Sequence, residues 1–294
     1  MAPTRWIGMS PDGQQVILKR FNGRFEVPPP GSQVQLEDAA HRRRAAVLDV
    51  ETTGLDADTD QVIEIGIRTF AWNGQTGGLL DVGPHYAGLQ DPGAPLSDEI
   101  SRLTGLTDAD LNGQQIDWLA VAALLADVEL IIAHNAAFDR PFVDRHLADN
   151  PHVWGCSLQH IDWKGMGFPV ARLEVLSIFH GFFVDAHRAL EDADALLHLL
   201  SHTMPDSEQG YLVGLAAGAQ RASVDFRATG SPFETKDLLK ARRYRWQPEA
   251  KVWQKQVDAA EAEGERQWLL DNVYNGQRRW QERVIEPQMR FRRP

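Results

Sequence analysis

The sequence AAVLDVETTGL at residues 45–55 is typical of a buried β-strand that ends in a tight turn. Asp49 and Glu51 stand two residues apart on this strand, so their side chains leave the same face. Two carboxylates on one face repel each other unless they are protonated, hydrogen-bonded or bound to a cation. An Asp-x-Glu pair alone would more often mark an exposed strand edge, but the apolar neighbours Leu48 and Val50 favour a buried strand with the acids at its end.

Two further segments place acids at the starts of helices. Residues 128–133 form a short apolar strand and residues 138–147 have a helical pattern, so Asp139 falls in the first turn of a helix that follows a buried strand. His187 and Asp192 lie near the start of another strongly helical stretch. Taken singly, each of these side chains would be an ordinary helix-start charge or surface residue.

The remaining pattern is that of an α/β protein. Residues 62–70 are apolar at alternate positions, which predicts a second strand antiparallel to the first. Helices are predicted to begin at residues 95–99 and to cover residues 117–127, 173–179 and 189–200. The succession of strand, polar turn and helix favours one sheet flanked by helices.

Three motifs together resemble those of the DEDDh, or DnaQ-like, family of 3′→5′ exonucleases. They are VLDVETTGL at residues 47–55, AHNAAFD at 133–139 and HRALEDA at 187–193, and they occur in the order that the family shows. The resemblance extends to PLSDE at 95–99 and TGLT at 104–107. It implies a ribonuclease H-like mixed sheet flanked by helices. The family includes RNase T, oligoribonuclease and the epsilon proofreading subunit of bacterial DNA polymerase III.

The resemblance also implies the chemistry of the site. Asp49, Glu51, Asp139 and Asp192 would hold two divalent metal ions, Mg²⁺ or Mn²⁺, and carboxylate oxygens are the hard ligands that these ions prefer. Asp49 would bridge both ions, Glu51 and Asp192 would complete one, and Asp139 would support the other. His187 would accept the proton of the attacking water, since its ordinary pKa leaves it largely neutral at working pH.

Four further residues are implied to bind substrate. Thr52 and Leu55 would contact the terminal nucleotide, with Leu55 beside the last base, while Asn135 and Phe138 would line the same pocket. Core positions are the alternative for Leu55 and Phe138.

The length of 294 residues suits a catalytic domain and a smaller second domain. The expected organisation is an N-terminal extension at residues 1–44, the exonuclease domain at 45–205, a linker or helix at 206–230, and a small basic, aromatic-rich α+β domain at 231–294. The net charge of −11 is divided unevenly, because residues 219–294 hold 16 Lys and Arg against 11 Asp and Glu, while the rest holds 14 against 30. Bound cations would reverse the local field where a phosphate approaches the acidic part.

The C-terminal domain is predicted to contain a helix at residues 233–240 and a β-hairpin at 244–253 with one aromatic face. Basic residues beside aromatic ones could hold phosphates and stack bases. A small hydrophobic core built around Trp246 and Trp253 is the alternative.

Composition points to a cytoplasmic protein without a membrane segment, because 43% hydrophobic residues can form a core and no apolar run is long enough for a spanning helix. The single cysteine, Cys156, excludes an internal disulfide and a cysteine-rich zinc site.

The expected function is release of nucleoside monophosphates from 3′ ends, most readily of single-stranded DNA, in proofreading or repair. The partners would be a nucleic acid with a free 3′ end and a DNA polymerase or repair protein. The sequence leaves open an RNA 3′ exonuclease of the RNase T or oligoribonuclease type, because the metal chemistry ignores the sugar. A non-catalytic module that binds nucleic-acid ends or a polymerase is the other alternative, and the intact acidic motifs argue against it.

Overall fold

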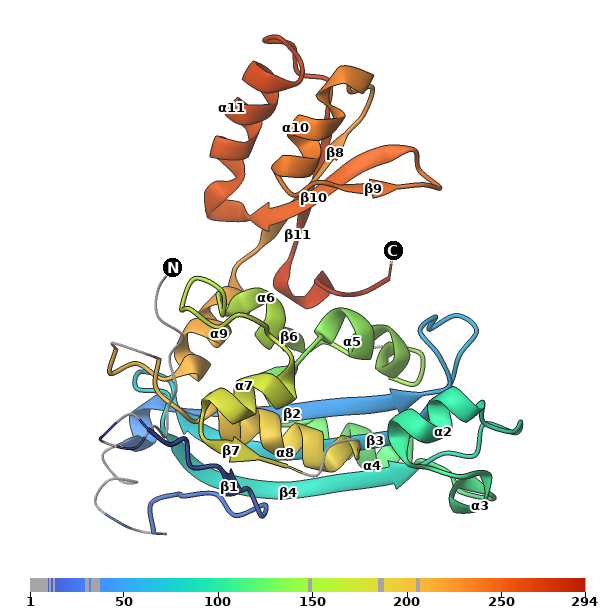
Figure 1. The fold of residues 1–294 in the computed structure, drawn as a ribbon, viewed down its shortest axis with the longest axis vertical. Helices are drawn as coiled ribbons and strands as arrows, with labels where there is room; N and C mark the ends of the chain where they lie inside the picture. Colours follow the sequence, from blue (N-terminus) through green and yellow to red (C-terminus); the bar gives the residue numbers. More distant parts are fainter. Residues whose placement is uncertain are drawn as a thin grey trace. The chain divides into compact units, whose positions relative to one another are not determined.

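The computed structural model describes residues 10, 12, 14–29, 32, 38–147, 150–184, 188–204 and 207–293. The chain divides into two compact units, one formed by Met1–Gly218 with Phe291–Pro294 and the other by Ala219–Arg290 (Figure 1). Each unit is built on a sheet of its own. In the part of the chain described, no helix has the length and apolar character needed to cross a membrane.

The first unit contains a five-stranded mixed sheet in the order β4–β3–β2–β5–β6 (Figure 1). Its strands are β2 (Arg42–Thr52), β3 (Val62–Asn73), β4 (Leu79–Leu89), β5 (Leu130–Ala133) and β6 (Val153–Cys156). The central strand β2 pairs antiparallel with β3 and parallel with β5. The predicted α/β, ribonuclease H-like sheet is therefore confirmed, and the strand that carries the first motif lies at its centre.

The strand β2 begins three residues earlier than the sequence pattern indicated. Arg42, Arg43 and Arg44 pair with the last residues of β3, and all three side chains are exposed. Backbone pairing does not require apolar side chains, so the apolar pattern of the sequence does not reveal that the strand begins at the three arginines.

Helices cover both faces of this sheet. The elements are η1 (Asp38–His41), α2 (Asp98–Thr104), α3 (Asp108–Leu111), α4 (Trp118–Leu125), α5 (Ala136–Asp144), α6 (Ser157–His160), α7 (Leu173–Phe179), α8 (Ala189–Leu200) and α9 (Tyr211–Gln220). The predictions for α7 and α8 are confirmed residue for residue. The helix α4 begins one residue later than predicted because Asp117 caps it, accepting from the N–H groups of Leu119 and Ala120, and it ends two residues earlier, at Leu125.

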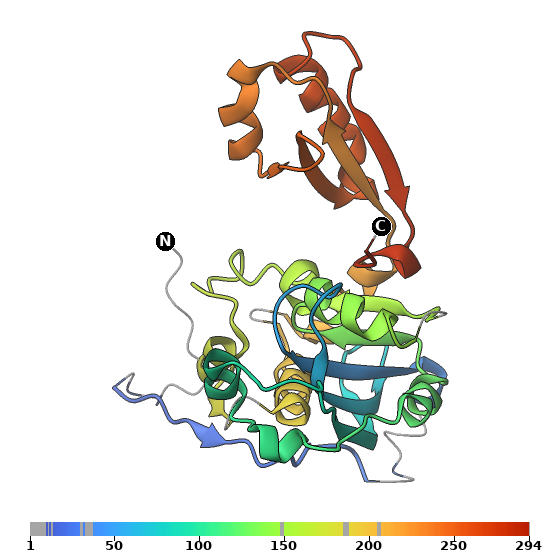
Figure 2. The ribbon, with the colours of Figure 1, turned by 90° about the vertical axis from the view of Figure 1, so that its right-hand side faces the viewer.

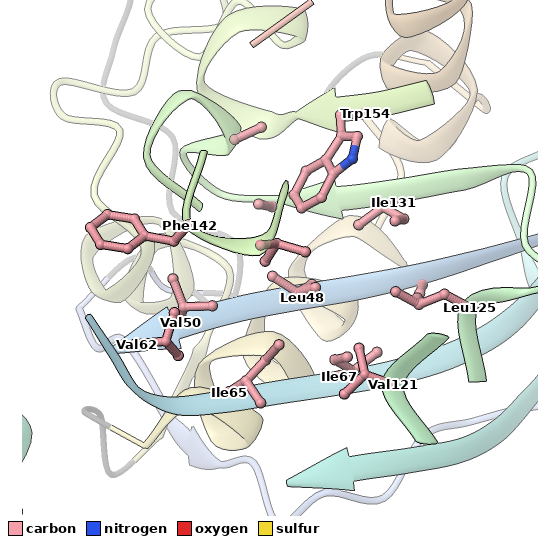
Figure 3. Packing of buried hydrophobic residues seen from close by; sticks show 14 of the residues in the cluster. Leu48, Val50, Val62, Ile65, Ile67, Val121, Leu125, Ile131, Phe142 and Trp154 are labelled. Atoms are coloured by element: carbon pink, nitrogen blue, oxygen red, sulfur yellow. The ribbon is translucent and has the colours of Figure 1, made fainter. Parts of the chain in front are cut away.

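One face of β2 belongs to the main hydrophobic core. Leu48 and Val50 point to the same side as Ile65 and Ile67 of β3 and pack with side chains of α4, α5 and β6 (Figure 3). Full burial of such a side chain contributes roughly 1.5–3 kcal/mol. A slip of one residue would reverse the faces of the strand, so this core fixes the direction in which Asp49 and Glu51 point.

The opposite face of the sheet receives α8 at very close range. A Cβ atom added to Gly66 of β3 would lie 2.1 Å from the backbone nitrogen of Leu190, so only glycine allows this approach. Arg68, two residues further along β3, donates to both carboxylate oxygens of Asp194 of α8 at 2.8 Å, through its Nε–H and one terminal nitrogen. Glycine and ion pair together hold the start of α8 beside Asp49, which is the register partner of Gly66.

A buried histidine lies between α7 and α9. One ring nitrogen of His180 is 2.7 Å from the Leu176 carbonyl oxygen and the other is 3.0 Å from the Tyr211 hydroxyl. Burial lowers the pKa of His180 to about 4, so the ring is neutral and donates only to Leu176. Close by, the short strands β1 (Lys19–Arg20) and β7 (Phe182–Phe183) pair in parallel.

The second unit contains a four-stranded antiparallel sheet in the order β11–β8–β10–β9. The strands are β8 (Ser223–Ala228), β9 (Arg245–Gln247), β10 (Val252–Asp258) and β11 (Gln281–Ile285). The helical elements are η2 (Phe233–Thr235), α10 (Lys236–Ala241), η3 (Ala259–Glu261), α11 (Ala262–Asn272) and η4 (Pro287–Met289) (Figure 2). The predicted helix and hairpin are both present.

The two tryptophans of the hairpin lie directly opposite each other on the face that carries the helices. Trp253 packs against the small core of the unit, while Trp246 is 47% exposed with its ring centroid 5.6 Å from that of Trp253. The core alternative therefore applies to Trp253.

We expect Gly66→Ala to destabilise the protein, because the new methyl group must displace the backbone of α8. Overpacking of this kind costs about 1–3 kcal/mol. The matched control is Gly214→Ala in α9, where a Cβ meets no atom within 4 Å and removal of a helical glycine should be neutral or stabilising by up to about 1 kcal/mol. Urea unfolding measures both. Equal stabilities of the two variants would contradict the close approach of α8.

Candidate active site

Three carboxylates meet on the sheet face below α8. Asp49 and Glu51 come from β2 and Asp192 comes from the first turn of α8, and each offers an oxygen within 4.8 Å of the others. All three side chains are partly accessible to solvent. Among the described residues, no other group of three or more His, Cys, Asp or Glu side chains has this spacing.

The fourth predicted acid lies beside this group. Asp139, in the first turn of α5, is 2% exposed, and one of its carboxylate oxygens accepts from the backbone N–H of Val50 at 3.3 Å. Its charge is the second-largest cause, after burial, of the raised pKa of Asp49. The structure therefore brings the ends of β2 and β5 together as the sequence predicted, with Asp139 adjoining the three clustered carboxylates.

Burial and mutual repulsion make these acids hard to ionise. For Asp49, Glu51 and Asp139, burial is the largest cause of a raised pKa, which reaches about 7 for Glu51 and about 8 for Asp139. The pKa of Asp49 is raised well above its ordinary value by burial and by the negative charges of Asp139, Asp192 and Glu51. Such a group must bind either protons or a cation.

The donor set fits a hard divalent cation. The clustered ligand atoms are all carboxylate oxygens, which suits Mg²⁺ or Mn²⁺ rather than softer metals. The single cysteine, Cys156, is fully buried in β6 and has its pKa raised by burial, so it has the properties of a core residue.

The sequence pattern missed Glu64, which lies directly opposite Glu51 on β3 and is 2% exposed. Arg188 donates to one of its carboxylate oxygens at 2.9 Å, and the other oxygen is buried with no hydrogen-bond partner in the described structure. Glu64 adds to the repulsion that raises the pKa of Asp49 and Glu51. A lone acid within the apolar run VIEI at residues 62–65 was the available signal.

His187 lies outside the described residues. Its neighbour Arg188 is the N-terminal cap residue of α8, and the ion pair between Arg188 and Glu64 ties that end of the helix to β3.

The four predicted substrate-binding residues differ in exposure. Leu55 is 86% exposed in the turn after β2, whereas Thr52 is buried and its hydroxyl donates to the Gly54 carbonyl at 2.6 Å. Asn135 is exposed at the start of α5 and makes no capping hydrogen bond through its side chain. Phe138 is partly buried, with its ring centroid 5.1 Å from that of Phe142.

The family model described as Exonuclease, RNase_T, matches residues 46–200. This segment contains most of β2 and all of β5, α5 and α8, and with them all four acids.

Bacterial polymerases are among the similar proteins. The chain is 32% identical over 174 residues to the DNA polymerase III PolC-type of Halalkalibacterium halodurans, which covers 55% of this chain and 11% of that protein. It is 34% identical over 167 residues to the PolC-type polymerase of Lacticaseibacillus paracasei, covering 52% and 11%. The chain thus spans about a tenth of the length of these relatives.

Solved structures of exonucleases are more distant. Exonuclease X in complex with 5′-overhanging duplex DNA has 20% identity and a TM-score of 0.42, covering 58% of this chain and 99% of that one. A zinc-bound Escherichia coli ExoI–ssDNA complex has 14% identity and a TM-score of 0.49, covering 74% and 63%.

We expect Mg²⁺ or Mn²⁺ to raise the unfolding temperature more at about pH 8 than at about pH 5. The raised pKa values mean that the metal-free folded state retains protons that the unfolded state releases near its ordinary values of 3.8 and 4.5. The contribution of these groups to stability is therefore present at low pH and is lost as pH rises through about 7 to 8. A cation replaces the protons, so its stabilising effect grows over the same range.

Thermal unfolding at both pH values, with metal and with EDTA, measures this effect. Saturation at 100 times the dissociation constant should stabilise the fold by about 2.7 kcal/mol. Asp49→Asn is the control, because it removes a ligand and part of the repulsion. A metal-induced shift that is independent of pH, or that persists unchanged in Asp49→Asn, would contradict this site.

Proposed function

Because the chain belongs to the RNase_T family of DnaQ-like exonucleases, we propose that it is a metal-dependent 3′→5′ exonuclease that releases nucleoside monophosphates from single-stranded DNA. The observation that carries this proposal is the meeting of Asp49, Glu51 and Asp192 within 4.8 Å beside the buried Asp139. Without a bound cation, an acidic cluster of this kind would destabilise the fold. Cation binding therefore accounts for the cluster, whereas packing does not.

The four acids would hold two divalent ions, which when bound neutralise phosphate charge and stabilise the attacking and leaving oxygens. Asp49 lies centrally, since Asp139, Asp192 and Glu51 all raise its pKa, and this position suits a ligand shared by both ions. Glu51 and Asp192 would serve one ion and Asp139 the other. The Val50 N–H group holds Asp139 and fixes the orientation of its carboxylate.

His187 would take the proton from the attacking water on a ring nitrogen. A neutral imidazole is required for this role, and its ordinary pKa near 6.5 supplies one at neutral pH. Arg188 and Glu64 act as positioning residues, because their 2.9 Å ion pair anchors the residue next to His187 against β3.

Leu55 supports a role in separating the last nucleotide from the next. A large apolar side chain that is 86% exposed, four residues from a candidate ligand, gains burial when a base packs on it. Asn135 and Phe138 begin the helix that carries Asp139, so they would line the pocket for the same nucleotide.

DNA is the preferred substrate in this proposal because the similar proteins include DNA polymerases of the PolC type. A role in proofreading or repair, beside a polymerase or repair protein, follows from the same relationship. Degradation of matched DNA and RNA strands tests the choice of sugar.

We expect a 5′-labelled single-stranded DNA to give a descending ladder of products with Mg²⁺ or Mn²⁺ and no cleavage with EDTA. Asp192→Asn should reduce the rate by at least about 10²-fold, since it removes a charged ligand of a cation that would stabilise the transition state. Glu191→Gln, which neutralises the adjacent exposed acid on the same helix, should keep the activity of the unaltered chain.

Internal cuts alone, or cleavage that survives EDTA, would refute the proposed reaction. Equal activity of Asp192→Asn and Glu191→Gln would refute the site. Faster degradation of RNA than of the matched DNA would replace the proposed substrate while leaving the metal chemistry in place.

We expect His187→Ala to lower turnover by about 10²- to 10⁴-fold, the usual contribution of a general base. Metal-induced thermal stabilisation should be unchanged, because the four carboxylates remain. The rate of single-turnover cleavage as a function of pH, measured at saturating metal so that the carboxylates bind cations instead of protons, separates the roles, since loss of the base then removes the ionisation near neutrality. A variant that loses metal or DNA binding but retains the pH profile would show a structural role instead.

A further inference from the structure

The second unit has a sheet with two chemically different faces. On β10, Lys255 points to the helices, where it binds Glu265 of α11 at 2.7 Å, and Trp253 and Val257 share that face in the small core. Gln254 and Gln256 alternate with these residues and lie on the opposite face. Since α10 and α11 both contribute to the small core, the face of Gln254 is the one turned away from them (Figure 2).

A row of long, donor-bearing side chains crosses all four strands on this second face. Arg245 of β9 pairs with Gln254, which pairs with Arg227 of β8, which pairs with Gln281 of β11. Three strand spacings of about 4.8 Å make this row about 14 Å wide. It contains no acidic residue, and Arg283 lies in the next row on β11.

The two carboxylates on this face are already neutralised. Asp225, which is 2% exposed, pairs with Arg227 at 3.3 Å and accepts from the Gln254 amide at 2.7 Å. Asp258, at the end of β10, pairs with Arg221. Arg245 and Arg283 are exposed, and neither makes an ion pair within the described residues. The face therefore presents uncompensated positive charge at both edges of the sheet.

We propose that this face binds the phosphodiester backbone of a single-stranded nucleic acid. Guanidinium groups match phosphate oxygens with two parallel hydrogen bonds, and a row that spans the sheet can contact more than one phosphate. The rows of Arg245 and Arg283 carry no aromatic side chain for stacking, so recognition is independent of base sequence. The choice of a single strand rests on the proposed exonuclease function.

Net charge supports this occupant. The second unit holds 14 Lys and Arg against 11 Asp and Glu, while the remainder of the chain holds 16 against 30. A polyanion is therefore attracted to the second unit, whereas the remainder of the chain, when metal-free, repels it. The face thus supplies affinity for the strand that the acidic unit alone would oppose.

The test compares two double variants of the full chain that lose the same charge. Arg245→Ala/Arg283→Ala alters the proposed face, and Lys236→Ala/Lys240→Ala removes two exposed lysines from α10. Fluorescence anisotropy of 5′-labelled oligo-dT, in EDTA to prevent cleavage, measures affinity over a range of salt concentrations. The arginine variant should bind more weakly, and its log–log salt slope should fall by about 1.4, or 0.7 for each lost phosphate contact.

The lysine variant should keep the affinity and slope of the unaltered chain, and urea unfolding should show that both variants are folded. Equal losses of oligo-dT affinity in the two variants would overturn the proposal, because binding would then depend on net charge and not on this face. Competition by polyglutamate as strong as that by unlabelled oligo-dT would overturn it in favour of an acidic protein partner. Binding in EDTA does not depend on catalysis, so absence of metal-dependent cleavage would refute the proposed function alone.

Discussion

Repulsion among clustered, partly buried carboxylates is the constraint on which the first unit depends. Two unit charges 4 Å apart near a protein surface interact by about 4 kcal/mol, and the oxygens of Asp49, Glu51 and Asp192 lie within 4.8 Å of one another. Protons can relieve this repulsion in the metal-free protein, as the raised pKa values of Glu51 and Asp139 indicate. Rigid elements must therefore hold the acids in place whether or not a cation is bound.

Packing and ion pairs supply that rigidity from opposite sides of the sheet. The buried row of Leu48 and Val50 gives β2 a fixed orientation, and each such side chain contributes roughly 1.5–3 kcal/mol. On the other side, the Arg68–Asp194 pair is almost buried at both ends, so removal of either partner would leave an uncompensated charge. Asp194 holds α8 against the sheet through this ion pair, and Asp192 of the same helix then reaches the acidic cluster. The two aspartates therefore have different roles.

Features that lie within one segment could be predicted from the sequence, and features that depend on pairing could not. The alternation around Asp49 and the helix that carries Asp192 are local, so the fold class and the clustered acids followed from the residues and the family resemblance. Glu64 opposes Glu51 only because a turn and a bulge set the register of β3 against β2. The importance of Gly66 depends on a helix that begins more than a hundred residues later. No periodicity in one strand reveals either contact.

The same two-residue period separates core from exposed chemistry in both sheets, but it yields sites of opposite electrostatic character. On β2 the polar face meets α8 and concentrates negative charge. Protons and cations therefore compete for this site, and its affinity for a cation depends on pH. In the second unit Arg227 on the polar face of β8 pairs with Asp225, and Arg221 pairs with Asp258 of β10, so the proposed attraction of this face for a strand would depend on salt. A chelator and added salt therefore act on different units. Chemistry and strand binding can be varied separately because each depends on the residues of one sheet face.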